Sequence, residues 1–259
     1  MEIIGLERDG DVLIATIDHP ESALNAVDAR LHGELAELFR VLKQESTARA
    51  IVLTAVGKAF SAGGDMSWFP ELRTPEATHA LRREGKQLIW DQLDVEVPIV
   101  CGLNGSAVGL GASVALLCDV IVMADDAKLI DPHVLVGLVA GDGGAAIWPL
   151  LLGPLAAKRH LMLGDPLTAA DAVRLGVAVE SCPAADVATR ARAWADRLAA
   201  GAPFAVQGTK IAVNAQIKQA LLTSFDVSTA LEIGCFFSND HAEAVDAFVN
   251  RRTPRFEGR

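Results

Sequence analysis

The sequence predicts an α/β fold, in which strands of a mostly parallel sheet alternate with helices and a helical region follows at the C-terminal end. Three observations predict it. Short, continuous apolar runs such as 50–55 (AIVLTA) and 98–103 (PIVCGL) are typical of buried parallel strands. Segments with apolar residues at helical spacing separate these runs. After about residue 184, amphipathic segments follow one another with no strand between them, which indicates a second, all-helical region.

The first elements expected are a hairpin and a helix. IIGLER and VLIATID flank Arg8-Asp9-Gly10-Asp11, and Asp-Gly is a preferred pair for a tight hairpin turn. A helix is expected from Val27 to about Gln44 with Asp28 as its cap. Its apolar residues fall at Leu31, Leu35, Leu38, Phe39 and Leu42.

The next segments alternate between strand and helix. A glycine-rich loop (57–65) follows the strand at 50–55, and a helix is expected over 75–93. After the strand at 98–103, a second glycine-rich loop (104–111) leads into a buried helix over 110–117 and a strand over 119–124. The segment DPHVLVGLVAGDGG (131–144) is expected to be an apolar connection that ends at the start of another helix.

The C-terminal region is expected to hold four helices, over 185–201, 203–218, 221–238 and 241–252. The division expected is therefore an α/β core over residues 1–195 and a helical trimerisation or lid region over residues 196–259.

Composition limits the possible functions. The 259 residues are 51% hydrophobic and 22% charged, which is enough to bury a full core. The net charge of −10 opposes binding to nucleic acid or to an anionic membrane. Neither a signal peptide nor a membrane span is expected, so the predicted location is the cytoplasm. The four cysteines, Cys101, Cys118, Cys182 and Cys235, have no metal-binding spacing, and no metal is predicted.

The two glycine-rich loops can carry chemistry through their backbone. Neither contains the GK[ST] of a P-loop, and 57–65 does not fit GxGxxG. Each follows a buried strand, so amides from both loops can converge on one carbonyl oxygen and form an oxyanion hole. Gly111-Ala112-Ser113-Val114-Ala115 approaches the GxSxG of serine hydrolases but lacks the last glycine, so Ser113 is interpreted as a small helix residue that faces the pocket.

Several motifs together resemble one family. ALNAVD (23–28), GKAFSAGGDM (57–66), LNGSAVGLGASVALLCD (103–119) and GLVAGDGG (137–144) resemble the crotonase, or enoyl-CoA hydratase/isomerase, superfamily, and so does the ending AFVNRRTPRFEGR. The resemblance covers essentially the whole chain. It implies a spiral of ββα units with a C-terminal helical trimerisation region, and a homotrimer or dimer of trimers. It also implies an acyl-CoA thioester substrate, with no cofactor other than the coenzyme A that the substrate carries.

The resemblance also implies positions for the site. The backbone N–H groups of Ala62 and Leu110 would form the oxyanion hole. The other substrate-binding residues implied are Ala23 and Leu24 along the pantetheine, Gly63, Gly64 and Asp65 in the turn at the adenine and pantetheine path, Ser113, and Gly141 beside the acyl group. Candidates for contacts to the phosphates of coenzyme A are Lys58, Lys210, Arg251, Arg252 and Arg255, the alternative being that these are solvated surface charges.

The sequence departs from this family at the two positions where hydratases carry glutamates. Ser113 stands at one of them and His133 at the other. Asp142 lies nine residues after His133 across a returning connection, so the two side chains are expected to be neighbours that exchange protons with the substrate. The structural alternatives are that Asp142 caps the following helix and that His133 is a loop histidine bonded to backbone.

Three functions stay open at this stage. One is an acyl-CoA lyase or isomerase, most similar to enoyl-CoA hydratases, that stabilises a thioester enolate and uses the His133/Asp142 pair. Another is a C–C bond hydrolase of β-diketones, because 6-oxocamphor hydrolase has a similar His/Asp pair, although its further histidine is absent at Leu110. The last is an acyl-CoA binder without catalytic activity.

Overall fold

Two sheets form the core of the chain, whose residues 1–259 are all described by a computed structural model. The larger sheet has the order β1 (Ile4–Asp9), β2 (Val12–Ile17), β3 (Ala50–Ala55), β5 (Ile99–Leu103), β7 (Val120–Ala124) and β10 (Glu180–Cys182). β1 and β2 form the predicted antiparallel hairpin, with Gly10 at a φ of 61° in its turn, and the remaining pairs are parallel. The α/β prediction is confirmed.

A second, smaller sheet is made from short strands that the sequence does not reveal. It has the order β4 (Ala59–Ser61), β6 (Ser106–Val108), β8 (Lys128–Ile130) and β9 (Leu167–Thr168). Because β3, β5 and β7 enter the first sheet while β4, β6 and β8, the strands that follow each of them, enter the second, the chain winds as a spiral of ββα units. Both glycine-rich loops therefore contain a short strand.

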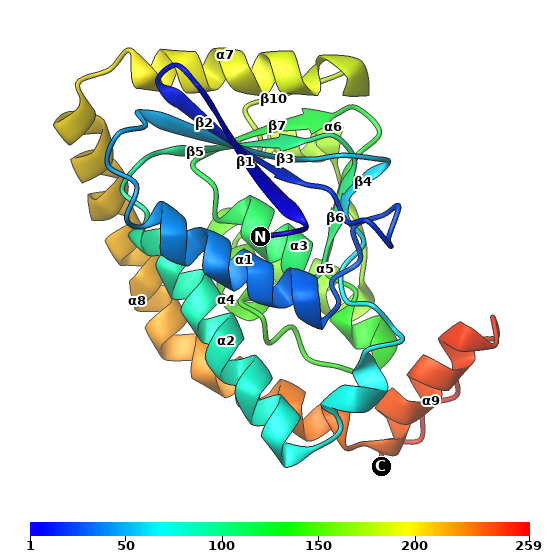
Figure 1. Cartoon of the computed structure of the whole chain (residues 1–259). Coiled ribbons are helices and arrows are strands. Elements are labelled where there is room, and N and C mark those ends of the chain that lie inside the picture. Colours follow the sequence, from blue (N-terminus) through cyan, green and yellow to red (C-terminus); the bar gives the residue numbers. More distant parts are fainter.

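Helices cover the sheets (Figure 1), and the first three match the helices expected over 27–44, 75–93 and 110–117. Asp28 caps the first one, as expected, by accepting a hydrogen bond from the backbone N–H of Leu31 at 2.8 Å. Through the core, the helices are α1 (Ala29–Leu42), α2 (Pro75–Asp94), α3 (Leu110–Leu116), α4 (Gly144–Leu152), α5 (Pro154–Leu163) and α6 (Ala169–Arg174), with 3-10 turns at Phe69–Leu72, His133–Val136 and Ala184–Asp186.

The C-terminal region differs from the prediction in two ways. α7 (Val187–Ala199) packs its buried alanines against β2, β3 and β5, so the boundary drawn at residue 195 falls inside a helix that covers the larger sheet. The two helices expected over 203–218 and 221–238 are one helix, α8 (Pro203–Phe236), because no proline, glycine or capping residue interrupts the chain between them. α9 (Asn239–Val249) follows after a bend and extends away from the core in Figure 1.

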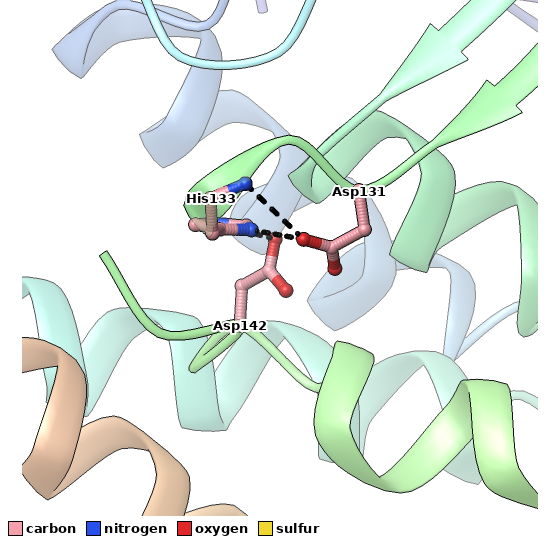
Figure 2. A group of neighbouring side chains, drawn as sticks. All are labelled: Asp131, His133 and Asp142. Atoms are coloured by element: carbon pink, nitrogen blue, oxygen red, sulfur yellow. Dashed lines mark hydrogen bonds and ion pairs between the residues drawn. The ribbon is translucent and has the colours of Figure 1, made fainter. Parts of the chain in front are cut away.

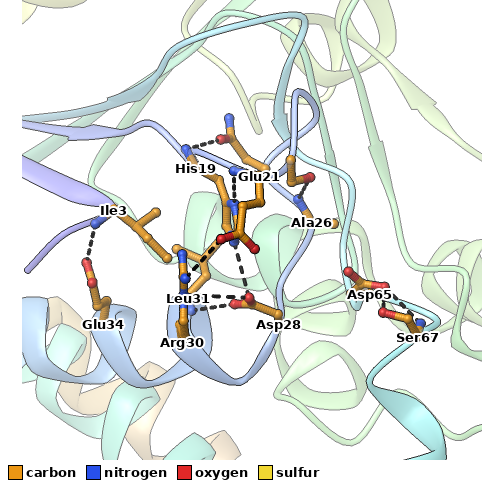
Figure 3. A network of polar contacts seen from close by, with 12 residues as sticks. Ile3, His19, Glu21, Ala26, Asp28, Arg30, Leu31, Glu34, Asp65 and Ser67 are labelled. Atoms are coloured by element: carbon orange, nitrogen blue, oxygen red, sulfur yellow. Dashed lines mark hydrogen bonds and ion pairs between the residues drawn. The ribbon is translucent and has the colours of Figure 1, made fainter.

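Two buried polar networks hold the segments around the site. Asn25, at a φ of 52°, accepts a hydrogen bond from the backbone N–H of His19 at 3.0 Å and donates to the carbonyls of Val56 and Ala59 at 2.9 and 3.1 Å. Figure 3 shows the neighbouring contact of His19 with Asp28, at 3.3 Å, and the turn in which Asp65 accepts hydrogen bonds from Ser67. These contacts fix the 18–28 loop against β4 and the first glycine-rich loop.

No single helix of the chain is both long enough and apolar enough to cross a membrane.

Candidate active site

A mostly apolar cavity of about 430 Å³ opens between the two glycine-rich loops, α2 and α8. Its volume lies within the range of about 300–1,000 Å³ that is typical of ligand sites. It brings together several residues that the sequence singled out: Ala62, Gly63, Gly64, Leu110, His133, Gly141 and Asp142. The rest of its wall is largely hydrophobic, so polar groups that face it act in a medium with little water.

Parallel pairing of β4 with β6 places the two glycine-rich loops side by side. A Cβ at Gly63, whose φ is 78°, would stand 3.0 Å from the carbonyl oxygen of Val108, so this close approach needs glycine. A Cβ at Gly64 would stand 2.6 Å from the ring of Phe69. The loops therefore meet at the cavity through their backbones.

The backbone N–H of Ala62 is not available for a ligand, because it donates a hydrogen bond to the carbonyl of Leu24 at 2.9 Å. The prediction that it forms the oxyanion hole is therefore wrong. The N–H of Gly64, two residues on, has no acceptor within the chain, and neither has that of Leu110, the first residue of α3. Both of these residues line the cavity. Only tertiary pairing decides which amide of the AGGD turn is free.

His133 is held by a carboxylate immediately before it. Its Nδ1 lies 2.7 Å from Oδ1 of Asp131, and that carboxyl is fully buried (Figure 2). A carboxylate only accepts hydrogen bonds, so Nδ1 carries the proton and Nε2 faces away from Asp131. The ring of His133 is thus bonded to a side chain and not to a backbone carbonyl, unlike the loop histidine considered as an alternative.

Asp142 faces the other ring nitrogen. Its Oδ2 lies 3.7 Å from Nε2 of His133 and makes no hydrogen bond, which confirms that the two side chains are neighbours. Its Oδ1 accepts hydrogen bonds from Oγ of Ser113 at 3.1 Å and from the N–H of Gly144 at 3.3 Å. Gly143, at a φ of 114°, is the N-cap of α4, so Asp142 is not the cap, although it binds one amide of that first turn.

Glu232 on α8 completes the cluster, and the sequence reasoning missed it. Its Oε1 lies 3.7 Å from Nε2 of His133, its side chain is 10% exposed, and it makes no hydrogen bond to the chain. Gly141 makes room for it, since a Cβ there would stand 2.1 Å from Oε2 of Glu232. A signal did exist: counting in helical steps from Leu221 and Phe225 places Glu232 on the buried face of α8.

Burial and mutual charge set the protonation of the cluster. Burial raises the pKa of Glu232 to about 8, with Asp142 and Asp131 adding to the rise and His133 opposing it. Burial also raises the pKa of Asp142 above its usual value, again against the effect of His133. Burial lowers the pKa of His133, but the carboxylates of Asp131, Asp142 and Glu232 outweigh it and hold that pKa well above the ordinary one. Near neutral pH the cluster therefore contains an imidazolium and a protonated Glu232.

The ligand atoms of Asp131, His133 and Asp142 lie within 4.8 Å of one another, close enough to be considered as a metal site. The 2.7 Å between His133 and Asp131 argues against it. Two ligands of one cation, each about 2.1 Å from it, are kept roughly 3 Å or more apart. The contact is a hydrogen bond, and a site without metal remains the prediction.

Other predicted substrate-binding residues lie outside the cavity. Ser113 is fully buried and contacts Asp142, so it does not face the pocket as predicted. The carboxylate of Asp65 closes a turn with Ser67. Ala23 and Leu24 do not line the cavity, and their place along the pantetheine stays a prediction.

The structure gives different outcomes for the five candidate contacts to the phosphates of coenzyme A. Lys210 is buried, with Nζ 2.8 Å from Asp119 and 3.0 Å from the carbonyl of Val97, so it cannot reach a ligand and that prediction is wrong. Arg252 lines the cavity and pairs with Glu243 and Asp246. Lys58, Arg251 and Arg255 are exposed, and their role stays a prediction.

Comparisons with known proteins identify the family of the chain. The family model described as enoyl-CoA hydratase/isomerase matches residues 7–259. A probable enoyl-CoA hydratase of Mycobacterium tuberculosis is 31% identical over 259 residues, which is 100% of this chain and 99% of that protein. The structure of an enoyl-CoA hydratase/isomerase from Mycobacterium paratuberculosis is 37% identical, with a TM-score of 0.89 over 94% of this chain and 97% of the other.

A β-diketone hydrolase from the cyanobacterium Anabaena has a similar structure as well. It is 27% identical, with a TM-score of 0.85 over 91% of this chain and 94% of its own. The match of the family model over nearly the whole chain, together with the relative that is 31% identical over its full length, decides the family. The chain belongs to the enoyl-CoA hydratase/isomerase family of the crotonase superfamily.

Proposed function

We propose that this protein is a lyase or isomerase that acts on acyl-CoA thioesters through an enolate. The observation that carries the proposal is the meeting, in one apolar cavity, of two unpaired backbone amides with an imidazole surrounded by carboxyl groups. The amides of Gly64 and Leu110 would donate to the thioester oxygen. This stabilises the negative charge that appears there when a proton leaves the α-carbon.

The cluster supplies both a proton acceptor and a proton donor. Asp142 is the base, because it lines the cavity and its Oδ2 makes no hydrogen bond. Glu232 is the acid, because a pKa of about 8 keeps it protonated near neutral pH. His133 is cationic and fixed by Asp131, and its Nε2 lies 3.7 Å from each of these two carboxyl groups. Isomerisation needs one group to take a proton and another to return it, and hydration needs a base for water and an acid for the α-carbon.

Steady-state assays with enoyl-CoA esters of different chain lengths and ring content test this proposal. Hydration is followed by loss of the conjugated enoyl absorbance, and isomerisation by its appearance from 3-enoyl esters. Turnover with any of them, abolished in Asp142→Asn and retained in Asp126→Asn on an exposed turn, supports the proposal. If the esters bind but none is converted, the protein is an acyl-CoA binder and the proposal fails.

A second candidate is a C–C bond hydrolase of β-diketones. It is favoured by the Anabaena structure and by an imidazole in place of a hydratase glutamate. Calorimetry separates the two candidates. Tight binding of acetoacetyl-CoA supports the acyl-CoA enzyme, whereas cleavage of a cyclic 1,3-diketone to an oxo acid, without binding of CoA esters, supports the hydrolase.

We also propose assembly as a homotrimer or a dimer of trimers, and no cofactor other than the coenzyme A of the substrate. Large apolar side chains on α8 and α9 support the assembly: Phe204 is 91% exposed, Phe248 62% and Val249 66%. Light scattering after size-exclusion chromatography gives the mass directly. A monomer at micromolar concentration contradicts this proposal.

A further inference from the structure

A second imidazole–carboxylate pair faces the same cavity and takes no part in the chemistry proposed above. His32 on α1 lines the cavity, and its side chain is 7% exposed. Its Nδ1 lies 2.8 Å from Oε1 of Glu84 on α2. His32 is on α1 and Glu84 on α2, whereas Glu232 is on α8, so His32 lines the cavity from a different element than the reacting cluster. Figure 1 shows α1 and α2 side by side.

The pairing determines what the other ring nitrogen can do. The hydrogen bond from His32 lowers the pKa of Glu84, so Glu84 is a carboxylate, which only accepts hydrogen bonds. Nδ1 of His32 therefore carries the proton. In the neutral ring Nε2 is then an acceptor, and the chain provides no donor for it. Nε2 has no hydrogen-bond partner within the chain and His32 lines the cavity, so a ligand that occupies this wall can donate a hydrogen bond to Nε2. A ligand that covered this acceptor without offering a donor would bind less well.

The surroundings of Nε2 are apolar and leave space beside it. A Cβ at Gly85, which also lines the cavity, would stand 3.9 Å from Nε2, so glycine there keeps the wall open next to this atom. The ring of Trp68 lies on another side, with its centroid 5.8 Å from that of His32. A polar acceptor beside an aromatic ring and an open glycine is suited to select one polar group on a largely apolar ligand.

The cavity is larger than a short acyl chain needs. A four-carbon acyl group takes up about as much space as four water molecules, roughly 30 Å³ each, so it leaves most of the 430 Å³ empty. The aromatic side chains of Trp68, Phe69, Phe225 and Phe236 contribute to the wall. Flat and rigid surfaces of this kind fit ring systems well.

We propose that Nε2 of His32 accepts a hydrogen bond from a hydroxyl group on a bulky, ring-containing acyl group, and that the enzyme selects such hydroxylated substrates. This inference depends on the proposed acyl-CoA function only for the statement that the ligand carries a thioester. The hydroxyl is recognised from the α1 wall while the thioester carbonyl lies at Gly64 and Leu110. His32 is thus a binding residue that sets specificity and takes no part in proton transfer.

The test is calorimetric binding of unreactive, saturated esters: cyclohexylacetyl-CoA and its 3-hydroxy and 4-hydroxy derivatives. We expect at least one hydroxylated ester to bind the wild type about tenfold more tightly than the parent, the gain that one buried hydrogen bond gives. His32→Phe should remove this gain and keep the affinity for the parent ester. Glu84→Gln weakens the preference for the tautomer of His32 with the proton on Nδ1, so it should reduce the gain in affinity. His79→Phe, at an exposed position of α2, is the matched control and should retain it.

Two results overturn the proposal: no hydroxylated ester binds more tightly than the parent, or the gain survives in His32→Phe. Failure of all three esters to bind the wild type would instead reject the proposed acyl-CoA function. In that case the same comparison is made with CoA-free methyl ketones that carry the same rings. A tenfold preference for a hydroxylated ketone that depends on His32 then supports the inference, and its absence rejects it.

Discussion

Nε2 of His133 lies 3.7 Å from Oδ2 of Asp142 and also 3.7 Å from Oε1 of Glu232, while Nδ1 of the same ring is bonded to Asp131. One imidazole thus joins a connecting segment of the core to the long C-terminal helix. The predictions below follow from this arrangement.

Replacing the proposed base should remove turnover while substrate binding persists. Asp142→Asn is nearly isosteric and can still accept hydrogen bonds from Ser113 and Gly144, but it cannot take a proton. We expect kcat to fall by about 10²–10⁴-fold, with little change in the affinity for an unreactive CoA ester. Kinetics and calorimetry measure the two quantities. An unchanged kcat in this variant would show that Asp142 only binds the first turn of α4 and takes no part in proton transfer.

Removing the partner of Nδ1 should change the titration of His133. In Asp131→Asn one of the carboxylates that hold the pKa of His133 above its usual value is gone, so this pKa should fall. Histidine NMR titration shows the shift directly. Asp131 also raises the pKa of Glu232, so the alkaline limb of the pH–rate profile should move to lower pH in the same variant. A lower maximum rate with an unchanged pH dependence would indicate a purely structural role for Asp131.

Activity should decline on the alkaline side as the acid loses its proton. Because burial raises the pKa of Glu232 to about 8, the rate should fall as the pH passes through this value. Glu232→Gln cannot donate the proton, so a low rate without this alkaline limb is expected. Asp226→Asn, an exposed acid on the same helix, is the control and should keep the wild-type profile. An unchanged alkaline limb in Glu232→Gln would assign that limb to another group.

The same group should make the protein less stable at alkaline pH. A folded-state pKa of about 8 lies above the ordinary value of 4.5, so between these values the folded state binds more protons than the unfolded state. The free energy of unfolding therefore falls as the pH rises across this window. His133, whose pKa is also raised, acts in the same direction above its unfolded value. Chemical denaturation at pH 5 and pH 9 should show a smaller loss in Glu232→Gln than in the wild type, and an equal loss would contradict this account.

A methyl group at Gly141 should disturb the cluster through a steric clash. It would stand 2.1 Å from Oε2 of Glu232, so Gly141→Ala must displace this side chain. We expect a loss of stability of about 1–3 kcal/mol, together with a lower kcat. Gly208→Ala, in open space on α8, should instead be neutral or slightly stabilising. Glu232→Gly removes both the carboxylate and the Cβ of residue 232, which would stand 2.7 Å from the new methyl group. Adding it to Gly141→Ala should recover part of the lost stability but not activity, and no recovery would locate the clash elsewhere.

The sequence by itself determined the α/β class, most element positions, the family and the pairing of His133 with Asp142. These features depend on local patterns: continuous apolar runs, helical spacing, the Asp-Gly turn and motifs within short segments. Two polar residues that flank a short connection are close because the chain between them is short and turns back. The same local patterns predicted two helices over 203–238, where the structure has the single helix α8.

Only the tertiary structure decided which groups face the cavity. Ala62 and Gly64 lie in one turn, and pairing with the 18–28 loop uses the first amide and leaves the second free. Lys210 is buried and pairs with Asp119, which is far away in the sequence, so a local pattern cannot show this contact. Glu232 reaches His133 because α8 folds back over the core, and its raised pKa arises from burial. Sequence fixes which side chains are present, but which of them share a dry space depends on contacts between distant segments.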